Sequence, residues 1–543
     1  MYEKILSSAL KELRKNRELA DELKLCCGAE DIRAESFGEY MLFFKEGSRK
    51  DFEKSYFDRR KYLNSCAALA LLYPENTEYL TRLQDIIWAI CDEYSWVLPA
   101  HAKSGTECDT DTIDLFAAET AFALSEISYL LHDRFEPLIL SRIKTEVKRR
   151  VTDVYMRTVS FWETDRGNWA GVCMSHVAGT LIYNDAALFE ELKPRIDKTF
   201  EYFLGGFGAD GACTEGIGYW QYGFGSFVCF ADLAFEYSNG KYDYLKGDKI
   251  KSIAMFLQRC VIGENMTVSF ADCDSEDSVN ITLMNMLKRK FPEDIVIPKL
   301  KYDRSCGGCP RWNLFFRSLI YGDNVSVNEI RNEEFEYYFK DAEWFVKNCG
   351  AYGFAAKGGH NCEPHNHNDV GSFIYAKNGV QILCDIGSGE YTRDYFGKDR
   401  YEYFCTSSLG HNVPVVNGKP QRYGREYCGK MSVGDGEITI DMTGAYGDKV
   451  KIIRRFKLND DGVLMTDSLK EAEITERLIS RCRPEIGDGK ITIGDAYILF
   501  DCKSWTVNVC GKEYTDHRCR IQTVYCIDFK PTAAADKFEI EIK

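Results

Sequence analysis

The sequence lacks any apolar run long enough to span a bilayer, and its first residues, MYEKILSSALKELRKNRELADELKL, carry charges throughout. A secretory signal needs a short apolar core after a basic start. This segment has the pattern of a charged amphipathic helix instead. We therefore expect a cytoplasmic protein with no export signal and no membrane partner.

Positive charge is also in short supply, with 69 Lys and Arg against 84 Asp and Glu and a formal net charge of -15. This balance argues against a nucleic-acid partner, and an acidic substrate would need a locally basic site. The 22 Cys show no framework spacing, which indicates free thiols in a reducing compartment. Cys306 and Cys309 form one CxxC pair, which we interpret as part of a linker.

Hydrophobic periodicity divides the chain of 543 residues. Up to about residue 261, apolar residues recur every three or four positions, as in LTRLQDIIWAICDEYSW, which predicts helix packed on helix. Beyond about residue 307 the period becomes two in short runs such as FFRSLIYG, VQILCDI, KVKIIRRFKL and RIQTVYCIDF, which predicts an antiparallel β-sandwich. We place a helical domain over 1–305 and a strand-rich domain over 306–543.

Histidine is scarce, yet half of the 8 fall between residues 360 and 411. In an extended backbone, His365 and His367 point to the same side. The runs GSFIYAK and VQILCDI flank Asn378-Gly379 and predict a hairpin that returns Asp385 to the histidines. A lone histidine is more often an ordinary core or surface residue, but His367, Asp385 and His411 together form a nitrogen and oxygen ligand set that suits Zn²⁺.

Two stretches of the helical half differ from their surroundings. In TDRGNWAGVCMSH, Asn168 stands at a predicted helix start, where it could serve as an ordinary N-cap. In DGACTEGIGYWQYGFGSF, glycines and aromatic rings surround Glu215. Glycine allows a backbone to approach a ligand closely, and flat rings suit sugars, although the same rings could simply pack in the core.

These motifs resemble the heparinase II/III-like polysaccharide lyases. The matching stretches are RGNW, DGACTEGIGYWQYG, HNHND, CDIGSGEY and SSLGHNVPVVNGKPQ, in the order of that family and in both halves of the chain. The resemblance implies a multi-domain fold with an N-terminal incomplete (α/α) toroid and a C-terminal antiparallel β-sandwich. It also implies an enzyme of carbohydrate metabolism that acts on an acidic polysaccharide or oligosaccharide.

The resemblance also implies residue roles. Asn168 matches the residue that holds the uronate carboxylate, Tyr222 matches the catalytic tyrosine of the pattern EGxxYxxY, and His365 matches the catalytic histidine. The matching zinc ligands are His367, Asp385 and His411, and we expect the Zn²⁺ to be a structural brace. For substrate contacts we expect Trp169, Glu215, Tyr219, Arg393 and Arg400, with Tyr401 and Arg422 nearby.

A lyase removes the proton at C5 of a uronic acid and expels the 4-linked oxygen, which gives a 4,5-unsaturated product. The adjacent carboxylate must be neutralised first, and Asn168 and His365 carry suitable donors. Tyr222 and His365 both remain candidates for the base. The alternatives are a glycoside hydrolase on the same toroid and a zinc-stabilised carbohydrate-binding protein without activity. Assembly into a homo-oligomer is left open.

Overall fold

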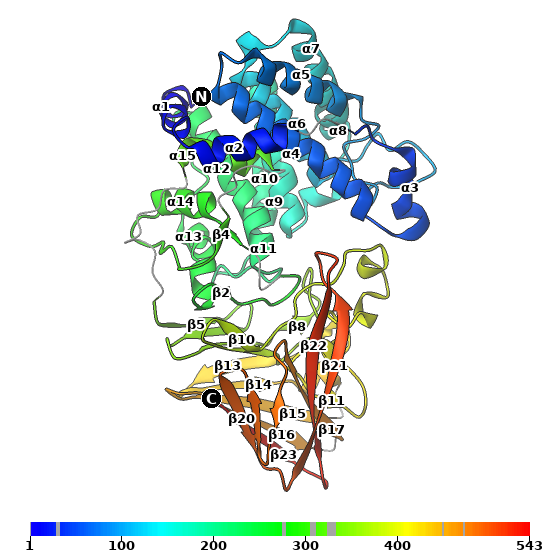
Figure 1. Cartoon of the computed structure of the whole chain (residues 1–543), viewed down its shortest axis with the longest axis vertical. Helices are drawn as coiled ribbons and strands as arrows, with labels where there is room; N and C mark the ends of the chain where they lie inside the picture. The colour runs from blue at the N-terminus through cyan, green and yellow to red at the C-terminus, as the bar shows by residue number, and fades with distance from the viewer. Residues whose placement is uncertain are drawn as a thin grey trace.

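The computed structural model describes residues 2–28, 33–273, 278–303, 311–322, 333–447, 450–470 and 473–543. Figure 1 shows a helical part at one end of the long axis and a strand-rich part at the other. The predicted order, a helical toroid followed by an antiparallel sandwich, is confirmed. The motif at Cys306 and Cys309 lies outside the described residues. Within the described ranges, no helix is both long and apolar enough to cross a membrane.

Helices packed on helices make up the N-terminal part. They are α1 Glu3–Leu13, α2 Arg17–Cys27, α3 Phe37–Glu46, α4 Lys50–Leu72, α5 Thr77–Asp92, α6 Leu115–Leu130, α7 Pro137–Val147, α8 Asp153–Arg157, α9 Asn168–Asn184, α10 Ala186–Gly205, α11 Ile217–Tyr219, α12 Gly225–Tyr237, α13 Asp248–Ala254, α14 Ile281–Lys290 and α15 Trp312–Tyr321. Short strands β1 Val261–Gly263, β2 Met266–Thr267, β3 Val279–Asn280 and β4 Tyr302–Asp303 lie in the stretch that leads towards the sandwich.

Helix α9 lies in the middle of this part, against α6, α10 and α12. It is buried along almost its whole length. Two glycines let neighbouring rings come close, because a Cβ on Gly171 would stand 2.7 Å from Phe203 and one on Gly179 would stand 2.5 Å from Phe122. This packing fixes the start of the helix, where Asn168 stands.

The run FFRSLIYG, which we expected to be a strand, is helical and belongs to α15. The prediction was wrong because a short, largely apolar run does not by itself distinguish a helix from a strand, and the helical period here rests on a few polar residues such as Asn313 and Arg317, four positions apart. Trp312 Nε1 and Arg317 Nη1 each donate to Oε2 of Glu126 in α6 at 2.8 Å. The helical core therefore continues past residue 305.

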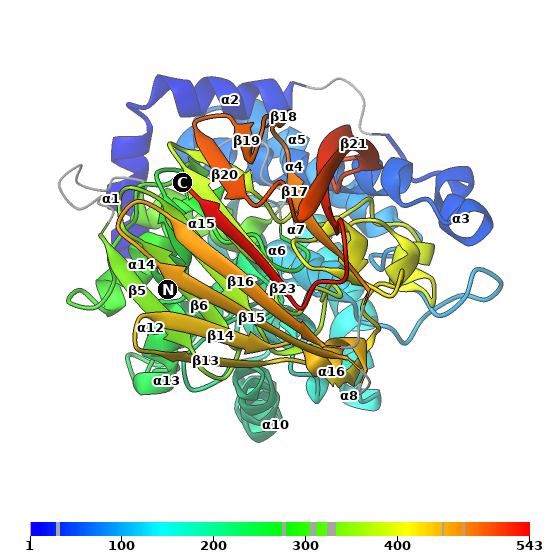
Figure 2. The same ribbon diagram turned by 90° about the horizontal axis from the view of Figure 1, so that it is seen from below.

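The C-terminal part contains three larger antiparallel sheets, with the strand orders β10-β9-β7-β6-β5, β11-β17-β22-β21 and β13-β14-β15-β16-β23-β20-β19-β18. Figure 2 shows the last of these across the lower face of the molecule, with the helices behind it. The strands are β5 Phe335–Phe339, β6 Trp344–Asn348, β7 Gly353–Lys357, β8 His360–Asn361, β9 Phe373–Lys377, β10 Val380–Leu383, β11 Val415–Val416, β12 Gly424–Cys428, β13 Lys430–Gly434, β14 Glu437–Asp441, β15 Lys451–Leu458, β16 Val463–Lys470, β17 Ile474–Ser480, β18 Glu485–Ile486, β19 Lys490–Ile493, β20 Ala496–Phe500, β21 Trp505–Thr515, β22 Ile521–Pro531 and β23 Lys537–Ile542.

Strands β9 and β10 form the hairpin predicted from the Asn-Gly pair. Asn378 and Gly379 have φ angles of 49° and 78°, the left-handed values that a tight two-residue turn requires. Val380 pairs with Lys377 directly after the turn. The chain leaves β10 towards Asp385, so the hairpin brings this carboxylate back to the histidine segment, as predicted.

Candidate active site

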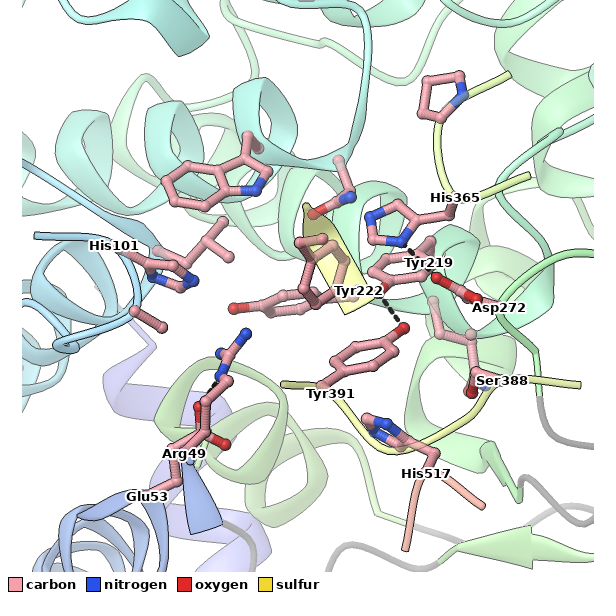
Figure 3. A pocket seen from close by; sticks show the side chains of 18 of the residues that line it. Arg49, Glu53, His101, Tyr219, Tyr222, Asp272, His365, Ser388, Tyr391 and His517 are labelled. Carbon is pink, nitrogen blue, oxygen red and sulfur yellow. Dashed lines mark hydrogen bonds and ion pairs between the residues drawn. The ribbon is translucent and has the colours of Figure 1, made fainter. Parts of the chain in front are cut away.

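A cavity of about 890 Å³ lies between the helical and strand-rich parts and is lined by residues of both. Figure 3 shows Tyr219 and Tyr222 from the helical side and His365 and Tyr391 from the other side. The sequence-predicted residues on its wall are Asn168, Trp169, Tyr219, Tyr222, His365, Arg393 and Arg400. Residues as far apart in the sequence as Asn168 and Arg400 are thus brought to one site.

Asn168 is the first residue of α9, while Gly167 takes the N-cap position, so the N-cap interpretation of Asn168 does not hold. Glu215 accepts the backbone N–H of Asn168 at 3.0 Å and its Nδ2 at 2.6 Å. The amide nitrogen has a second N–H to offer a ligand. Within the described chain the buried Oδ1 of Asn168 has no hydrogen-bond partner.

Glu215 is buried next to Asn168. Its Oε1 accepts the backbone N–H of Asn168, and its Oε2 accepts the side-chain N–H. Burial raises the pKa of the Glu215 carboxyl, and the nearby His365 and the Asn168 donors oppose this shift. Glu215 therefore orients Asn168. A direct contact between Glu215 and a substrate stays a prediction.

Tyr222 lies in a π-helical turn, Trp220–Phe224, that joins α11 to α12. Such turns re-aim a side chain within a helix and often mark functional positions. The Arg311 guanidinium stands 4.2 Å from the centre of its ring. Its hydroxyl is buried and has no partner at hydrogen-bonding geometry among the described residues. Burial and the negative charge of Glu119 raise the pKa of Tyr222 well above its ordinary value, so the phenol stays protonated.

Two other aromatic residues were predicted for the site, and one of them, Tyr219, contacts both of its sides. The ring of Tyr219 stacks on that of His365, with 4.0 Å between centroids and 27° between planes. The Tyr219 hydroxyl is 2.8 Å from that of Tyr391. Trp169 presents its ring to His101 at 4.8 Å. Their contacts with a sugar stay predictions.

His365 stands in a stretch without regular structure and has a φ of 58°, which is strained for a residue other than glycine. Its Nδ1 lies 2.9 Å from Oδ2 of Asp272, and its Nε2 lies 3.9 Å from Oε2 of Glu215. Since the ionised Asp272 is an acceptor, Nδ1 carries the proton and Nε2 keeps a lone pair in the neutral ring. On the strand-rich side of the cavity, His365 Nε2 is therefore a nitrogen that can accept a proton.

Asp272 is fully buried and gathers several donors. Burial alone would raise its pKa, but the charge of Arg400 and the hydrogen bonds from His365 and His367 hold the pKa well below the ordinary value. Arg400 donates to Asp272 Oδ2 at 2.9 Å, so its charge is already paired. Its predicted role in binding substrate stays a prediction.

The remaining basic candidates lie further out. Arg393 is half exposed and donates to the carbonyl oxygen of Phe44 at 3.2 Å, which links the strand-rich part to α3. Tyr401 lines the cavity and donates to Asn366. Arg422 contacts Tyr427. The local positive charge at the cavity therefore comes from groups that are largely engaged with the protein itself.

The proposed zinc ligands His367, Asp385 and His411 meet in one buried cluster, with their ligand atoms within 4.8 Å of one another. Nε2 of His411 lies 2.9 Å from the Cys405 carbonyl oxygen, and Nε2 of His367 lies 3.0 Å from Asp272. Each imidazole thus turns Nδ1 inward. The inward atoms, including Asp385 Oδ2, lack hydrogen-bond partners in the described chain. Such a set fits a divalent cation, and these residues would hold Zn²⁺.

Sequence reasoning missed Asp272 and Glu119. Tyr395 donates to Asp272 Oδ1 at 2.6 Å, and Glu119 affects Tyr222 through its charge. Asp272 stands in SFADCD, a short segment with no periodicity or spacing that marks a site. Only its position after β2, in the stretch that leads from toroid to sandwich, could have suggested a role.

No protein-family model matches this chain, and no curated protein does. Among solved structures, a mutant of the heparan sulfate lyase HepC from Pedobacter heparinus superposes with a TM-score of 0.61 and 14% identity, covering 98% of this chain and 88% of that one. A heparinase III structure gives 0.59 and 12%, covering 94% and 85%. The Streptomyces coelicolor A3 chondroitin AC lyase in complex with chondroitin sulphate gives 0.57 and 9%, covering 97% and 78%.

At these identities the comparisons establish the fold. This chain has the α/α toroid and β-sandwich architecture of polysaccharide lyases such as heparinase III and chondroitin AC lyase. The resemblance inferred from five short motifs is thereby confirmed for the architecture. Activity and residue roles have to be argued from the site.

Proposed function

We propose that this protein is a lyase that cleaves uronic-acid-containing polysaccharides or oligosaccharides by β-elimination and leaves 4,5-unsaturated uronate products. One observation carries the proposal. A protonated phenol, Tyr222, and an imidazole with a free nitrogen, His365, line the same cavity from opposite parts of the chain, together with the amide of Asn168. These are the acid, the base and the carboxylate-binding group that the reaction needs.

Asn168 neutralises the substrate carboxylate in this proposal. The C5 proton of a uronate is poorly acidic, because the neighbouring carboxylate already carries a negative charge. A fixed N–H that donates to this carboxylate stabilises the charge that builds up when the proton leaves. The two bonds from Glu215 hold Asn168 in place before substrate arrives, so little reorganisation is needed.

His365 is the base and Tyr222 the acid in the same scheme. His365 Nε2 is the unprotonated nitrogen, because Nδ1 donates to Asp272. The raised pKa of Tyr222 makes it a poor base but leaves it a proton to give to the departing oxygen. The C5 proton moves to His365, the bond between C4 and oxygen breaks, and the phenol proton moves to that oxygen.

Zinc has a supporting role in this proposal. His367, Asp385 and His411 would hold it, and His367 is two residues from His365. When bound, the ion supplies a positive charge that binds the histidine segment to the sandwich. Every proton transfer takes place on the side chains named above.

The named activities of the similar structures, a heparan sulfate lyase and a chondroitin AC lyase, support an acidic glycan as the substrate of this chain and a heparinase II/III-like assignment. The hydrolase alternative needs two carboxylates on either side of the bond. Glu215 is engaged by Asn168 and Asp272 by His365 and Arg400, so neither is free for that role. The loss of these two candidates weakens the hydrolase alternative.

The test is to incubate the protein with a panel of uronate polymers and oligomers, with and without sulfate, and to follow ultraviolet absorbance. A lyase generates a conjugated double bond and an absorbance that grows with each cleavage. New reducing ends without absorbance would show hydrolysis and overturn the proposal. Binding without any cleavage would instead support the carbohydrate-binding alternative.

A further inference from the structure

Asp272 joins two groups of residues that the reaction scheme treats separately. It follows β2, in the stretch that leaves the helical part, and the residue before it, Ala271, has a φ of 66°. A left-handed alanine costs energy and persists only where its surroundings impose it. This bend places a carboxylate from the toroid side among residues of the strand-rich part.

The two oxygens of Asp272 divide four donors between them. Oδ2 is 2.9 Å from His365 Nδ1 and 2.9 Å from Arg400 Nη2. Oδ1 is 3.0 Å from His367 Nε2 and 2.6 Å from the Tyr395 hydroxyl. A carboxylate has about four lone-pair sites, so Asp272 is saturated and has none left for a substrate.

The two imidazoles contact Asp272 through different ring nitrogens. His365 binds the carboxylate through Nδ1 and so presents Nε2 to the cavity. His367 binds it through Nε2 and so presents Nδ1 to the cluster with Asp385 and His411. Which ring nitrogen is free in a histidine is decided by the hydrogen bond that the other nitrogen makes.

We propose that Asp272 is the positioning residue of the site: one carboxylate fixes both the proton-accepting nitrogen of His365 and the metal-binding nitrogen of His367. The part that concerns His365 rests on the proposed lyase function. The part that concerns His367 does not, because metal affinity can be measured without any substrate. The active site and the metal cluster are thus two ends of one hydrogen-bonded unit.

The test is Asp272→Asn, which keeps the shape but offers a single accepting oxygen. In either orientation of the amide, one imidazole faces an N–H group instead of an acceptor. We expect zinc affinity, measured by competition with a chelator, to fall about 10- to 100-fold. We expect kcat to fall about 10²- to 10⁴-fold while KM stays within about threefold, because the substrate-binding groups remain.

Tyr395→Phe is the matched control. It removes one hydrogen bond to the same carboxylate and leaves His365, His367 and Arg400 in place. We expect zinc affinity and kcat to stay within about threefold of the parent protein. A purely structural role for Asp272 would instead lower the melting temperature in both variants and leave kcat and zinc affinity of the folded protein unchanged, which would overturn the inference.

Asp272→Glu is the second test variant, to be used if Asp272→Asn does not fold. It keeps the charge but moves it by one methylene, and displacement by about 1 Å is enough for a roughly 10²-fold loss in kcat. Zinc affinity and kcat equal to those of the parent would contradict the inference. If the parent gives no unsaturated product from any glycan, the proposed function fails, and zinc affinity alone then decides the role of Asp272.

Discussion

The two parts of the molecule hold their contributions to the cavity by different physical means. Asn168 and Tyr222 belong to helical segments whose positions are set by packing, at the start of α9 and in the π-helical turn before α12. His365 lies in a stretch without regular structure and with a left-handed φ. Its place depends on side-chain bonds to Asp272 and on the cluster around His367.

This difference shows which kind of segment needs charged groups to hold a site residue in place. A buried helix has its backbone groups paired and its axis fixed by neighbours, so a residue on it needs little more than one partner, as Glu215 is for Asn168. A segment without regular backbone hydrogen bonds must be held in place by contacts with other parts of the protein. Here the fixing groups are a buried carboxylate and a set of ligand atoms that face one another. Loss of helical packing and loss of these charges should therefore affect the protein differently.

The largest effect should follow from Tyr222→Phe, which removes the proton donor and leaves helical packing intact. We expect kcat to fall about 10²- to 10⁴-fold with an unchanged melting temperature. Kinetics by ultraviolet absorbance and a thermal melt measure both. Tyr237→Phe, in α12 and bonded to Glu190 near the surface, is the control and should leave kcat unchanged. An active Tyr222→Phe variant would show that Tyr222 does not supply the proton, and Asn168 would then be the only group that the helical part contributes to the proposed reaction.

Low pH should destabilise the helical part through protonation of His176, which is fully buried in α9. Burial lowers its pKa from 6.5 to about 4. Between these values the unfolded chain takes up a proton that the folded chain does not, so stability falls as pH falls below about 6.5. The loss at pH 5 is about 2 kcal/mol. Denaturant unfolding at pH 7 and pH 5 measures it.

His176→Gln removes the titrating group and should reduce that pH dependence, whatever its effect on stability at pH 7. His132→Gln is the control, since His132 is exposed. Equal pH dependence in the parent and both variants would show that the helical part is not destabilised through His176. The acid sensitivity would then have to come from other titrating groups, such as Asp109 and Glu146, whose pKa values are lowered in the fold.

Removal of zinc should destabilise the strand-rich part. With zinc at about 100-fold above its dissociation constant, binding to the folded state alone stabilises it by about 2.7 kcal/mol. A chelator should lower the melting temperature and raise amide hydrogen exchange at 364–369, while exchange in α9 stays unchanged. Loss of activity with no change in melting temperature would mean that the ion takes part in the chemistry directly and is no brace.

The sequence predicted the parts of the site that have a local pattern. The Asn-Gly turn predicted the hairpin that returns Asp385 to the histidines, and the family resemblance implied that His367, Asp385 and His411 form one ligand set, which the structure brings together. It failed for α15, because a short, largely apolar run does not by itself distinguish a helix from a strand. It also failed for Asp272, because the contacts of this residue are to partners more than 90 positions away. Such contacts leave no trace in periodicity or spacing.

The smallest effect should come from Glu215→Gln, which leaves Asn168 with one acceptor in place of two. An unmet buried donor costs about 1–2 kcal/mol, so we expect kcat/KM to fall about tenfold. Glu190→Gln, at the surface, is the control and should have no effect. If Glu215→Gln instead costs as much as Tyr222→Phe, Glu215 reacts with the substrate itself. A reacting group of the helical part would then be a buried carboxylate itself, and the contrast with the strand-rich part would be weaker.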